Sequence, residues 1–329
     1  MLHNIMAEFL GTALMILFGV GVHCDEVLNK TKYRGSGHLF AITTWGFGIT
    51  VVLFIFGGVC LNPAMALAQA ILGMISWKCF IPYCVAEFLG ALCGACIVYV
   101  MYADHFKASE GVVDPVAIRN IFSTNPNIRN LPRNFFVEAF ATFVFLSSVL
   151  GIAHTSEEIL PIGVGILVWA VGMGLGGPTG FAMNQARDLG PRLAYTLLPI
   201  QNKTDNDWQY GLLVPGIAPF VGAVCAALFA KGFLGMLFMI LGSTLDMGVG
   251  PFLFFHTVNL VVQSLPLEYY TTKINSLPVI LEIISLFKEQ MVSHKRSTTF
   301  SNVENSCGIH ACDLAARFRA ASMIKIPRW

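Results

Sequence analysis

The sequence predicts an all-α membrane protein with six transmembrane helices and two re-entrant half-helices, arranged as an inverted repeat. The first observation is composition: 55% of the 329 residues are hydrophobic, 12% are charged, and the mean hydropathy is +0.68. This composition excludes an ordinary soluble domain. The second is six apolar stretches long enough to cross a bilayer. The third is a pair of glycine-rich motifs that end in asparagine, one in each half of the chain.

The expected spans divide the chain into two similar halves, about 5–102 and 133–234. Each half holds three spans, and an odd number of spans inverts the second copy in the membrane. Residues 1–235 therefore form one membrane domain, and residues 236–329 form a tail with no convincing further span. The loop 104–133 is expected to be polar and is rich in asparagine and proline. The expected spans are about 5–22, 39–56, 80–101, 135–153, 159–175 and 212–234.

The second asparagine motif reads Gly-Gly-Pro-Thr-Gly-Phe-Ala-Met-Asn-Gln-Ala-Arg-Asp over residues 176–188. Its glycines and proline stop any helix, and Asn184 is a good N-cap for a short helix that follows. Polar side chains such as Arg187 and Asp188 are costly in lipid. Non-helical backbone at membrane depth is tolerated only where protein buries it or it lines a water-filled cavity. The motif therefore predicts a pore or a substrate site.

The first motif, Gly-Gly-Val-Cys-Leu-Asn-Pro-Ala over residues 57–64, repeats this pattern. Asn62 is the expected cap, and Pro63 occupies the first helical position, which proline favours. Asn62-Pro63-Ala64 matches Asn184-Gln185-Ala186 of the second half. Such a pair indicates broken helices that meet at the membrane midplane.

A lone carboxylate lies early in the first span of each half, Glu8 and Glu138. An ionisable residue within a span is by default a candidate functional residue. We expect each to accept hydrogen bonds from the re-entrant loop of its half; a position near the lipid headgroups is the alternative.

On these residues the chain resembles the aquaporin family (major intrinsic proteins) and, more narrowly, its aquaglyceroporin branch. The resemblance covers about residues 5–234. It includes Ala-Glu-Phe-Leu-Gly at both 7–11 and 86–90, and Leu-Val-Pro-Gly at 213–216. The pair Arg187-Asp188 resembles the sequence found at this place in the glycerol-conducting branch. The resemblance implies a passive channel for glycerol, other small neutral solutes and water.

Such a channel must exclude ions and protons, and this exclusion depends on the electrostatics of the pore. Two half-helices that meet head to head place two positive dipole ends at the pore centre. Asn62 and Asn184 cap them and can offer N–H donors to a passing water, so that no proton wire forms; cations also meet a desolvation penalty. Arg187 can hold two hydroxyl groups and repel cations. The alternative for Arg187 is a structural salt bridge, for example to Asp188.

The resemblance also implies a selectivity filter. Glycerol has a carbon face and a hydroxyl face, so an apolar wall should stand opposite polar groups. Trp45 and Phe181 would form the aromatic corner beside Arg187, and Gly172 would leave room for the solute. The backbone of Thr179, Gly180, Ala182 and Met183 would supply carbonyl acceptors. Taken alone, Trp45 would more often be a packed or interfacial aromatic residue.

Two departures from the family pattern support alternatives. Gln185 stands where the pattern has proline, and the first re-entrant loop is a few residues short, with Cys60 in place of a longer run. A non-conducting structural membrane protein with the same fold is therefore one alternative. A mainly water-selective pore is another, although Gly172 and Phe181 argue against it.

The remaining expectations concern location and partners. We expect a multi-pass plasma-membrane protein, a homotetramer by resemblance, with both termini cytoplasmic. Lys and Arg in the loops 24–37 and 104–133 agree poorly with that orientation, whereas possible N-glycosylation sites at Asn29 and Asn202 support it. The formal net charge of +1 gives no sign of nucleic-acid binding. We expect no catalytic residue, no cofactor and no metal.

Overall fold

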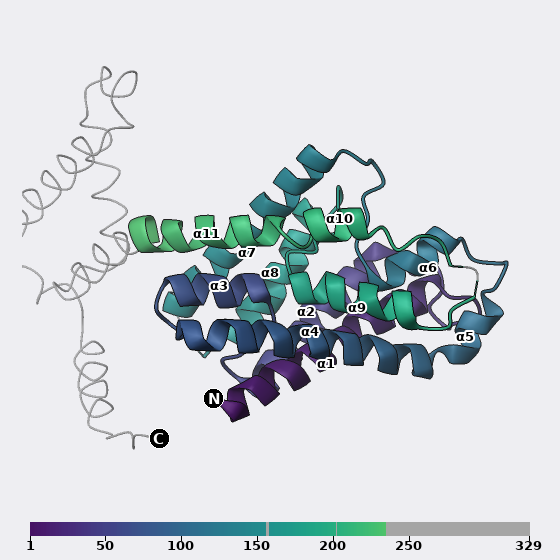
Figure 1. The fold of residues 1–329 in the computed structure, drawn as a ribbon, viewed down its shortest axis with the longest axis horizontal. Helices are drawn as coiled ribbons and strands as arrows, with labels where there is room; N and C mark the ends of the chain where they lie inside the picture. Colours follow the sequence, from purple (N-terminus) through teal and green to yellow (C-terminus); the bar gives the residue numbers. More distant parts are fainter. Residues whose placement is uncertain (156–157, 202, 235–329) are drawn as a thin grey trace, which may run out of the picture. The chain divides into compact units, whose positions relative to one another are not determined.

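A computed structural model of the chain describes residues 1–155, 158–201 and 203–234. The predicted tail, 236–329, and the possible glycosylation site Asn202 lie outside the described residues. The described part is helical (Figure 1). Its elements are α1 (Leu2–Val27), α2 (His38–Phe56), α3 (Pro63–Ile71), α4 (Trp77–Met101), α5 (Ala103–Ala108), α6 (Pro115–Phe122), α7 (Leu131–Thr155), α8 (Leu160–Leu175), α9 (Gln185–Leu197), α10 (Trp208–Leu213), α11 (Ala218–Phe229) and the π-helical turn η1 (Ala230–Leu234).

Five of the described segments are long and apolar enough to cross a membrane: α1, α2, α4, most of α7, and the segment Trp208–Phe233. The remaining expected span, 159–175, corresponds to α8, which is apolar but has only 16 residues. The six predicted spans therefore all appear as apolar helices, and the two half-helices α3 and α9 lie between them in the sequence.

Two expected segments show more detail in the structure. The polar loop expected over 104–133 holds the short helices α5 and α6, and α6 begins where the Asp114 side chain accepts a hydrogen bond from the Val116 N–H at 3.1 Å and Pro115 occupies the first helical turn. The sixth span, expected over 212–234, begins earlier and breaks between α10 and α11. Pro215 has no N–H to donate there, and the Gly216 N–H reaches the Gly211 carbonyl instead, at 2.8 Å.

The helix contacts follow an approximate two-fold pattern that relates α1, α2, α3 and α4 to α7, α8, α9 and α11. Helix α1 packs on α2 and α4, and α7 packs on α8 and α11 in the same way. Half-helix α9 packs on α4 of the first half, and α3 packs on α11 of the second. Helices α2 and α8 pack on each other. The predicted inverted repeat therefore describes the packing as well as the sequence.

Equivalent glycines allow the closest helix approaches in the two halves. A Cβ added to Gly90 of α4 would lie 2.2 Å from the Phe9 carbonyl oxygen of α1, and one added to Gly222 of α11 would lie 2.4 Å from the Ala139 carbonyl oxygen of α7. Phe9 and Ala139 directly follow the carboxylates Glu8 and Glu138. Small residues that let two backbones approach are typical of helix packing in membranes, and here they bring each carboxylate close to the re-entrant loop of its half.

Outside the spans, Asp207 joins two loops. Its carboxylate accepts hydrogen bonds from both terminal nitrogens of Arg129, one of them at 3.0 Å, and it caps α10 through the Tyr210 N–H at 3.3 Å. Burial opposes ionisation of Asp207, but the hydrogen bonds from Arg129 and from the Tyr210 backbone outweigh burial and hold its pKa below the ordinary value.

This lowered pKa predicts an acid-labile contribution to stability. A carboxylate with a depressed folded-state pKa stabilises the fold above its unfolded pKa, near 4, and this contribution disappears as the pH falls through the folded pKa. Asp207→Asn keeps the helix cap but removes the charge pair. We expect the variant to lose up to about 1 kcal/mol at neutral pH and to lose less stability than the wild type below about pH 4. Thermal unfolding in detergent across this pH range measures both, and an unchanged acid slope would contradict the assignment.

Candidate functional site

The site is built where the two half-helices begin. Asn62 caps α3 and Asn184 caps α9, and their backbone angles are nearly the same, with φ of −161° and −158°. The Asn62 Oδ1 accepts from the Ala64 N–H at 2.9 Å, and the Asn184 Oδ1 accepts from the Arg187 N–H at 3.1 Å. Each side chain satisfies a donor that the helix itself leaves unpaired.

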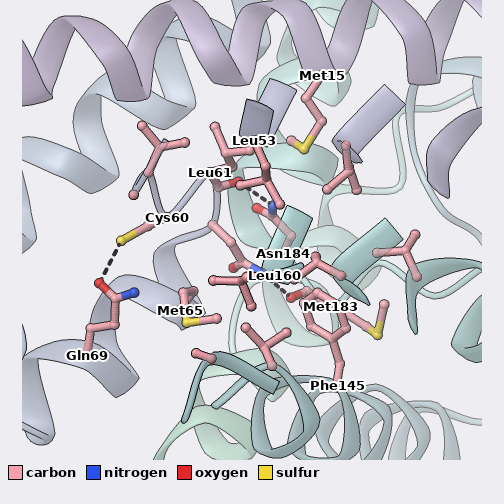
Figure 2. A pocket seen from close by; sticks show the side chains of 18 of the residues that line it. Met15, Leu53, Cys60, Leu61, Met65, Gln69, Phe145, Leu160, Met183 and Asn184 are labelled. Atoms are coloured by element: carbon pink, nitrogen blue, oxygen red, sulfur yellow. Dashed lines mark hydrogen bonds between the residues drawn. The ribbon is translucent and has the colours of Figure 1, made fainter. Parts of the chain in front are cut away.

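The two asparagines also bond reciprocally to the opposite loop. The Asn62 Nδ2 donates to the Met183 carbonyl at 2.9 Å, and the Asn184 Nδ2 donates to the Leu61 carbonyl at 2.7 Å (Figure 2). Leu61 and Met183 each precede an asparagine and both adopt left-handed backbone angles, with φ of 55° and 47°. Each amide nitrogen carries a second N–H, so one donor per asparagine is used to join the halves and another is left for a solute.

Buried carboxylates hold both loops. Glu8 accepts from the N–H groups of Cys60 and Leu61 at 2.7 and 2.9 Å. Glu138 accepts from the N–H groups of Ala182 and Met183 at 3.0 and 2.9 Å. Lipid offers no hydrogen bonds to exposed backbone, so these four bonds replace those that water would supply.

A cavity of about 560 Å³ runs beside this junction. Its wall is mostly aliphatic, including Met15, Leu53 and Leu160 (Figure 2). Polar groups on the wall include the side chains of Asn62, Asn184, Gln69 and Arg187. An apolar wall with a few placed polar groups is the usual form of a small-molecule site. The other predicted site residues that line it are Phe181, Ala182 and Met183; Trp45, Gly172, Thr179 and Gly180 do not line this cavity.

Trp45, predicted to belong to the aromatic corner, lies next to Arg187. The guanidinium carbon lies 4.7 Å from the centre of the Trp45 ring, within the range of a cation–π contact. A Cβ added to Gly172 would lie 3.3 Å from the end of the Phe181 ring and 2.8 Å from Ile42. Gly172 therefore makes room for the Phe181 ring and for Ile42; its predicted role toward a solute stays a prediction.

The first re-entrant loop is short in the structure too. It covers residues 57–61 between α2 and the cap of α3, whereas residues 176–183 connect α8 to the cap of α9. All five residues of the short loop line the cavity. The Cys60 thiol donates to the Gln69 Oε1 at 3.2 Å, and Figure 2 shows the two side chains pointing toward each other. The shortening therefore leaves the cap and the carboxylate bonds of this half in place.

Asp188 pairs with Arg192 rather than with Arg187. The Arg192 Nε donates to one Asp188 oxygen at 2.8 Å, and the backbone N–H and hydroxyl of Thr124 donate to the other at 2.7 Å each. Arg192 also donates to the carbonyls of Thr124 and Asn206. This buried network ties two loops to α9. Asp188 and Arg192 lie four residues apart on α9, a spacing that allows a helical ion pair, whereas the contacts to Thr124 and Asn206 join segments that no local pattern relates.

The remaining motif residues are buried, and one possible glycosylation site is engaged. Pro63, Ala64 and Ala186 pack at the first turns of the half-helices. The Asn29 Nδ2 donates to the Ala108 carbonyl at 2.9 Å, so the nitrogen that would carry a glycan is engaged within the protein.

Glu87 of α4 is a third buried carboxylate that sequence reasoning did not assign. One of its oxygens accepts from the Asn62 N–H at 2.9 Å, and the other has no hydrogen-bond partner among the described residues. One ligand atom each of Glu8, Cys60 and Glu87 lies within 4.8 Å of the others. Three of the four carboxylate oxygens already accept backbone N–H groups, so the cluster serves the loop. The repeated Ala-Glu-Phe-Leu-Gly around Glu8 and Glu87 was the available signal.

The unpaired oxygen of Glu87 predicts that an amide is tolerated there. Glu87→Gln keeps an acceptor for the Asn62 N–H and replaces the unpaired oxygen with a donor that faces Glu8. We expect equal or higher thermal stability for Glu87→Gln, and a loss of about 1–3 kcal/mol for Glu87→Leu, which leaves the Asn62 N–H unpaired. Thermal unfolding of the purified variants tests this. A Gln variant that unfolds as readily as the Leu variant would refute it.

Gln185, at the first position of α9, is buried, and neither its amide oxygen nor its amide nitrogen has a hydrogen-bond partner in the described chain. Its counterpart in the first half is Pro63. The preceding residue, Asn184, has φ −158° and ψ 117°, as compatible with a following proline as Asn62 is at φ −161° and ψ 115°.

This geometry predicts that Gln185→Pro stabilises the protein. The substitution removes two unpaired buried polar atoms, and proline at the first helical position needs no N–H. We expect a gain of about 1 kcal/mol, measured as a higher thermal-unfolding midpoint in detergent. Gln185→Ala separates the two causes, because it removes the polar atoms without fixing the backbone. A destabilised proline variant would contradict the argument.

Comparisons with known proteins agree with one another. A family model described as major intrinsic protein matches residues 1–230. The chain is 69% identical over 237 residues to glycerol uptake facilitator protein 4 of Lactiplantibacillus plantarum and 67% identical to the D/L-lactic acid transporter of the same organism; each match covers 72% of this chain and all of the relative. Among solved structures it is similar to the aquaglyceroporin from Plasmodium falciparum, with 25% identity and a TM-score of 0.64 over 72% of this chain and 98% of that one.

Proposed function

Because the chain belongs to the major intrinsic protein family, we propose that it is a passive channel for glycerol, other small neutral solutes and water. One observation carries this proposal: the two capped half-helices meet at Asn62 and Asn184 beside a cavity whose wall is mostly apolar. A passive channel makes and breaks no covalent bond, so it needs neither catalytic residues nor a cofactor.

Exclusion of ions and protons follows from the charges at this junction. Both half-helices direct their positive ends toward it, and the second N–H of each asparagine can donate to the same water or hydroxyl. A water that accepts from the protein donates outward on both sides, which interrupts a proton wire. Cations meet the helix ends, the Arg187 guanidinium and the cost of desolvation in an aliphatic cavity.

Selection for glycerol depends on contacts with both the hydroxyl face and the carbon face of the solute. Arg187 donates to hydroxyl groups through its fixed N–H fork. Phe181 and Trp45 face the carbon atoms, and Gly172 leaves room that a larger residue would fill. The carbonyls around Ala182 and Met183 accept from hydroxyl groups as the solute passes. In the cell we propose a multi-pass plasma-membrane protein, a homotetramer with one pore per subunit and with cytoplasmic termini.

Undissociated lactic acid is a second candidate solute. The relative named D/L-lactic acid transporter is 67% identical to this chain over 237 residues, which is the whole length of that relative. The protonated acid is neutral and carries a hydroxyl beside a carbon face, as glycerol does. The lactate anion would lose its hydration in the aliphatic cavity, so transport through this pore should follow the neutral fraction of the acid.

Stopped-flow light scattering on proteoliposomes tests the proposed function. After a sucrose step we expect fast shrinkage, and after a glycerol step fast shrinkage followed by fast reswelling. A lactic acid gradient should give uptake that rises as the pH falls toward 4. Fast water flow without glycerol entry would favour a water pore. Permeabilities equal to those of empty liposomes, with folded protein verified, would favour the non-conducting alternative.

Arg187→Val and Trp45→Ala test the filter in the same liposomes. We expect either substitution to raise the leak of protons or cations by about tenfold, because each removes about 1–2 kcal/mol of the barrier that the charge and the wall supply. A pH-sensitive dye inside the liposomes measures the proton leak. Unchanged leak and unchanged solute selectivity in both variants would contradict the proposed filter.

A further inference from the structure

A chain of polar contacts connects His38, the exposed first residue of α2, to the indole nitrogen of Trp45. The Trp45 Nε1 lies 3.2 Å from the His23 Nε2 of α1. The His23 Nδ1 lies 3.5 Å from one oxygen of Glu26, and the Nδ1 of the exposed residue His38 lies 3.3 Å from the other. None of these three contacts belongs to the cavity or to the loop anchors described above.

The Trp45 ring is held from α1 at two points. A Cβ added to Gly19 would lie only 2.1 Å from the indole, so the ring packs directly on the α1 backbone. His23 lies one helical turn later on the same face and binds the indole nitrogen. Arg187 contacts the ring through a cation–π interaction. This residue of the proposed filter is therefore held on the α1 side by one helix backbone and one imidazole.

The indole N–H of Trp45 determines the protonation state of His23. An indole nitrogen can only donate, so the His23 Nε2 must accept. That nitrogen then carries no proton, and the imidazole is neutral with its proton on Nδ1, facing Glu26. A protonated imidazole has a donor at both nitrogens and cannot keep the bond to Trp45. The charged groups that act on His23 are Glu26, His38 and Arg187.

We propose that His23 is a specificity-determining residue of this channel: it positions the Trp45 wall of the filter, and only its neutral form does so. The proposal rests on the proposed channel function. Protonation of His23 removes the hydrogen bond to the indole and brings a second positive charge close to Arg187. The ring is then released from one of its two supports, and the balance between glycerol and water flow changes with pH.

The test measures the ratio of glycerol to water permeability in proteoliposomes from about pH 4 to pH 8, which spans the ordinary range of histidine titration and extends below it. We expect the wild-type ratio to change by up to about fivefold, the factor that one net hydrogen bond supplies. His23→Gln offers an amide oxygen to the indole and does not titrate. It should keep the high-pH ratio at every pH, whereas His23→Leu, which has no acceptor, should show an altered ratio at every pH.

Two further variants separate positioning from a general structural effect. Trp45→Phe keeps an aromatic wall without a donor, so substitution of His23 in this background should leave the ratio unchanged. His3→Gln removes an exposed histidine near the N-terminus. The permeability ratio of this variant should depend on pH as that of the wild type does. If His23→Leu does not fold, His23→Gln and the Trp45→Phe pair still decide the matter.

The outcomes distinguish the two proposals. A wild type that conducts, together with a His23→Gln variant that keeps the full pH response, overturns the role of His23 and leaves the channel function intact. A conducting wild type whose ratio does not depend on pH, with His23→Leu identical to it, overturns that role as well. A wild type that conducts neither glycerol nor water overturns both proposals.

Discussion

The structure depends on the pairing of backbone N–H groups that lipid cannot satisfy. Two loops leave helical geometry within the membrane domain, and each exposes consecutive N–H groups just before a half-helix. Glu8 and Glu138 accept these groups in pairs, with four bonds of 2.7 to 3.0 Å. A carboxylate offers two oxygens in a fixed fork, so one side chain satisfies two neighbouring donors. Without them each loop would carry unpaired backbone groups at a cost of several kcal/mol.

The rest of the junction follows from this anchoring. Once the loops are held, Leu61 and Met183 present their carbonyls to the opposite asparagine, and the two half-helices cap each other across the repeat. Each half therefore completes the site of the other, which is why neither half alone could form it. The glycines that let α4 and α11 approach α1 and α7 serve the same end, since they bring helix backbones together next to the carboxylates.

Much of this could be predicted from the sequence because the signals are local. The apolar stretches, the two asparagine motifs and the lone carboxylates Glu8 and Glu138 each depend on a few neighbouring residues. The contacts that were missed join distant segments. Glu87 accepts from the Asn62 N–H, Arg192 donates to the Thr124 carbonyl, and His23 accepts from Trp45. No periodicity or spacing specifies such a pair, because the pairing depends on which helices pack.

The two halves are alike where they support the loops and differ in the residues of the proposed filter. The caps, the left-handed residues before them and the carboxylate forks have a counterpart in each half. Arg187, Phe181 and the longer loop 176–183 belong only to the second half, and Trp45 with its partner His23 belongs only to the first. Symmetry explains how a polar site is held within a membrane domain, whereas selectivity requires departures from that symmetry. Residues that determine selectivity are therefore expected at positions where the two halves of the repeat differ.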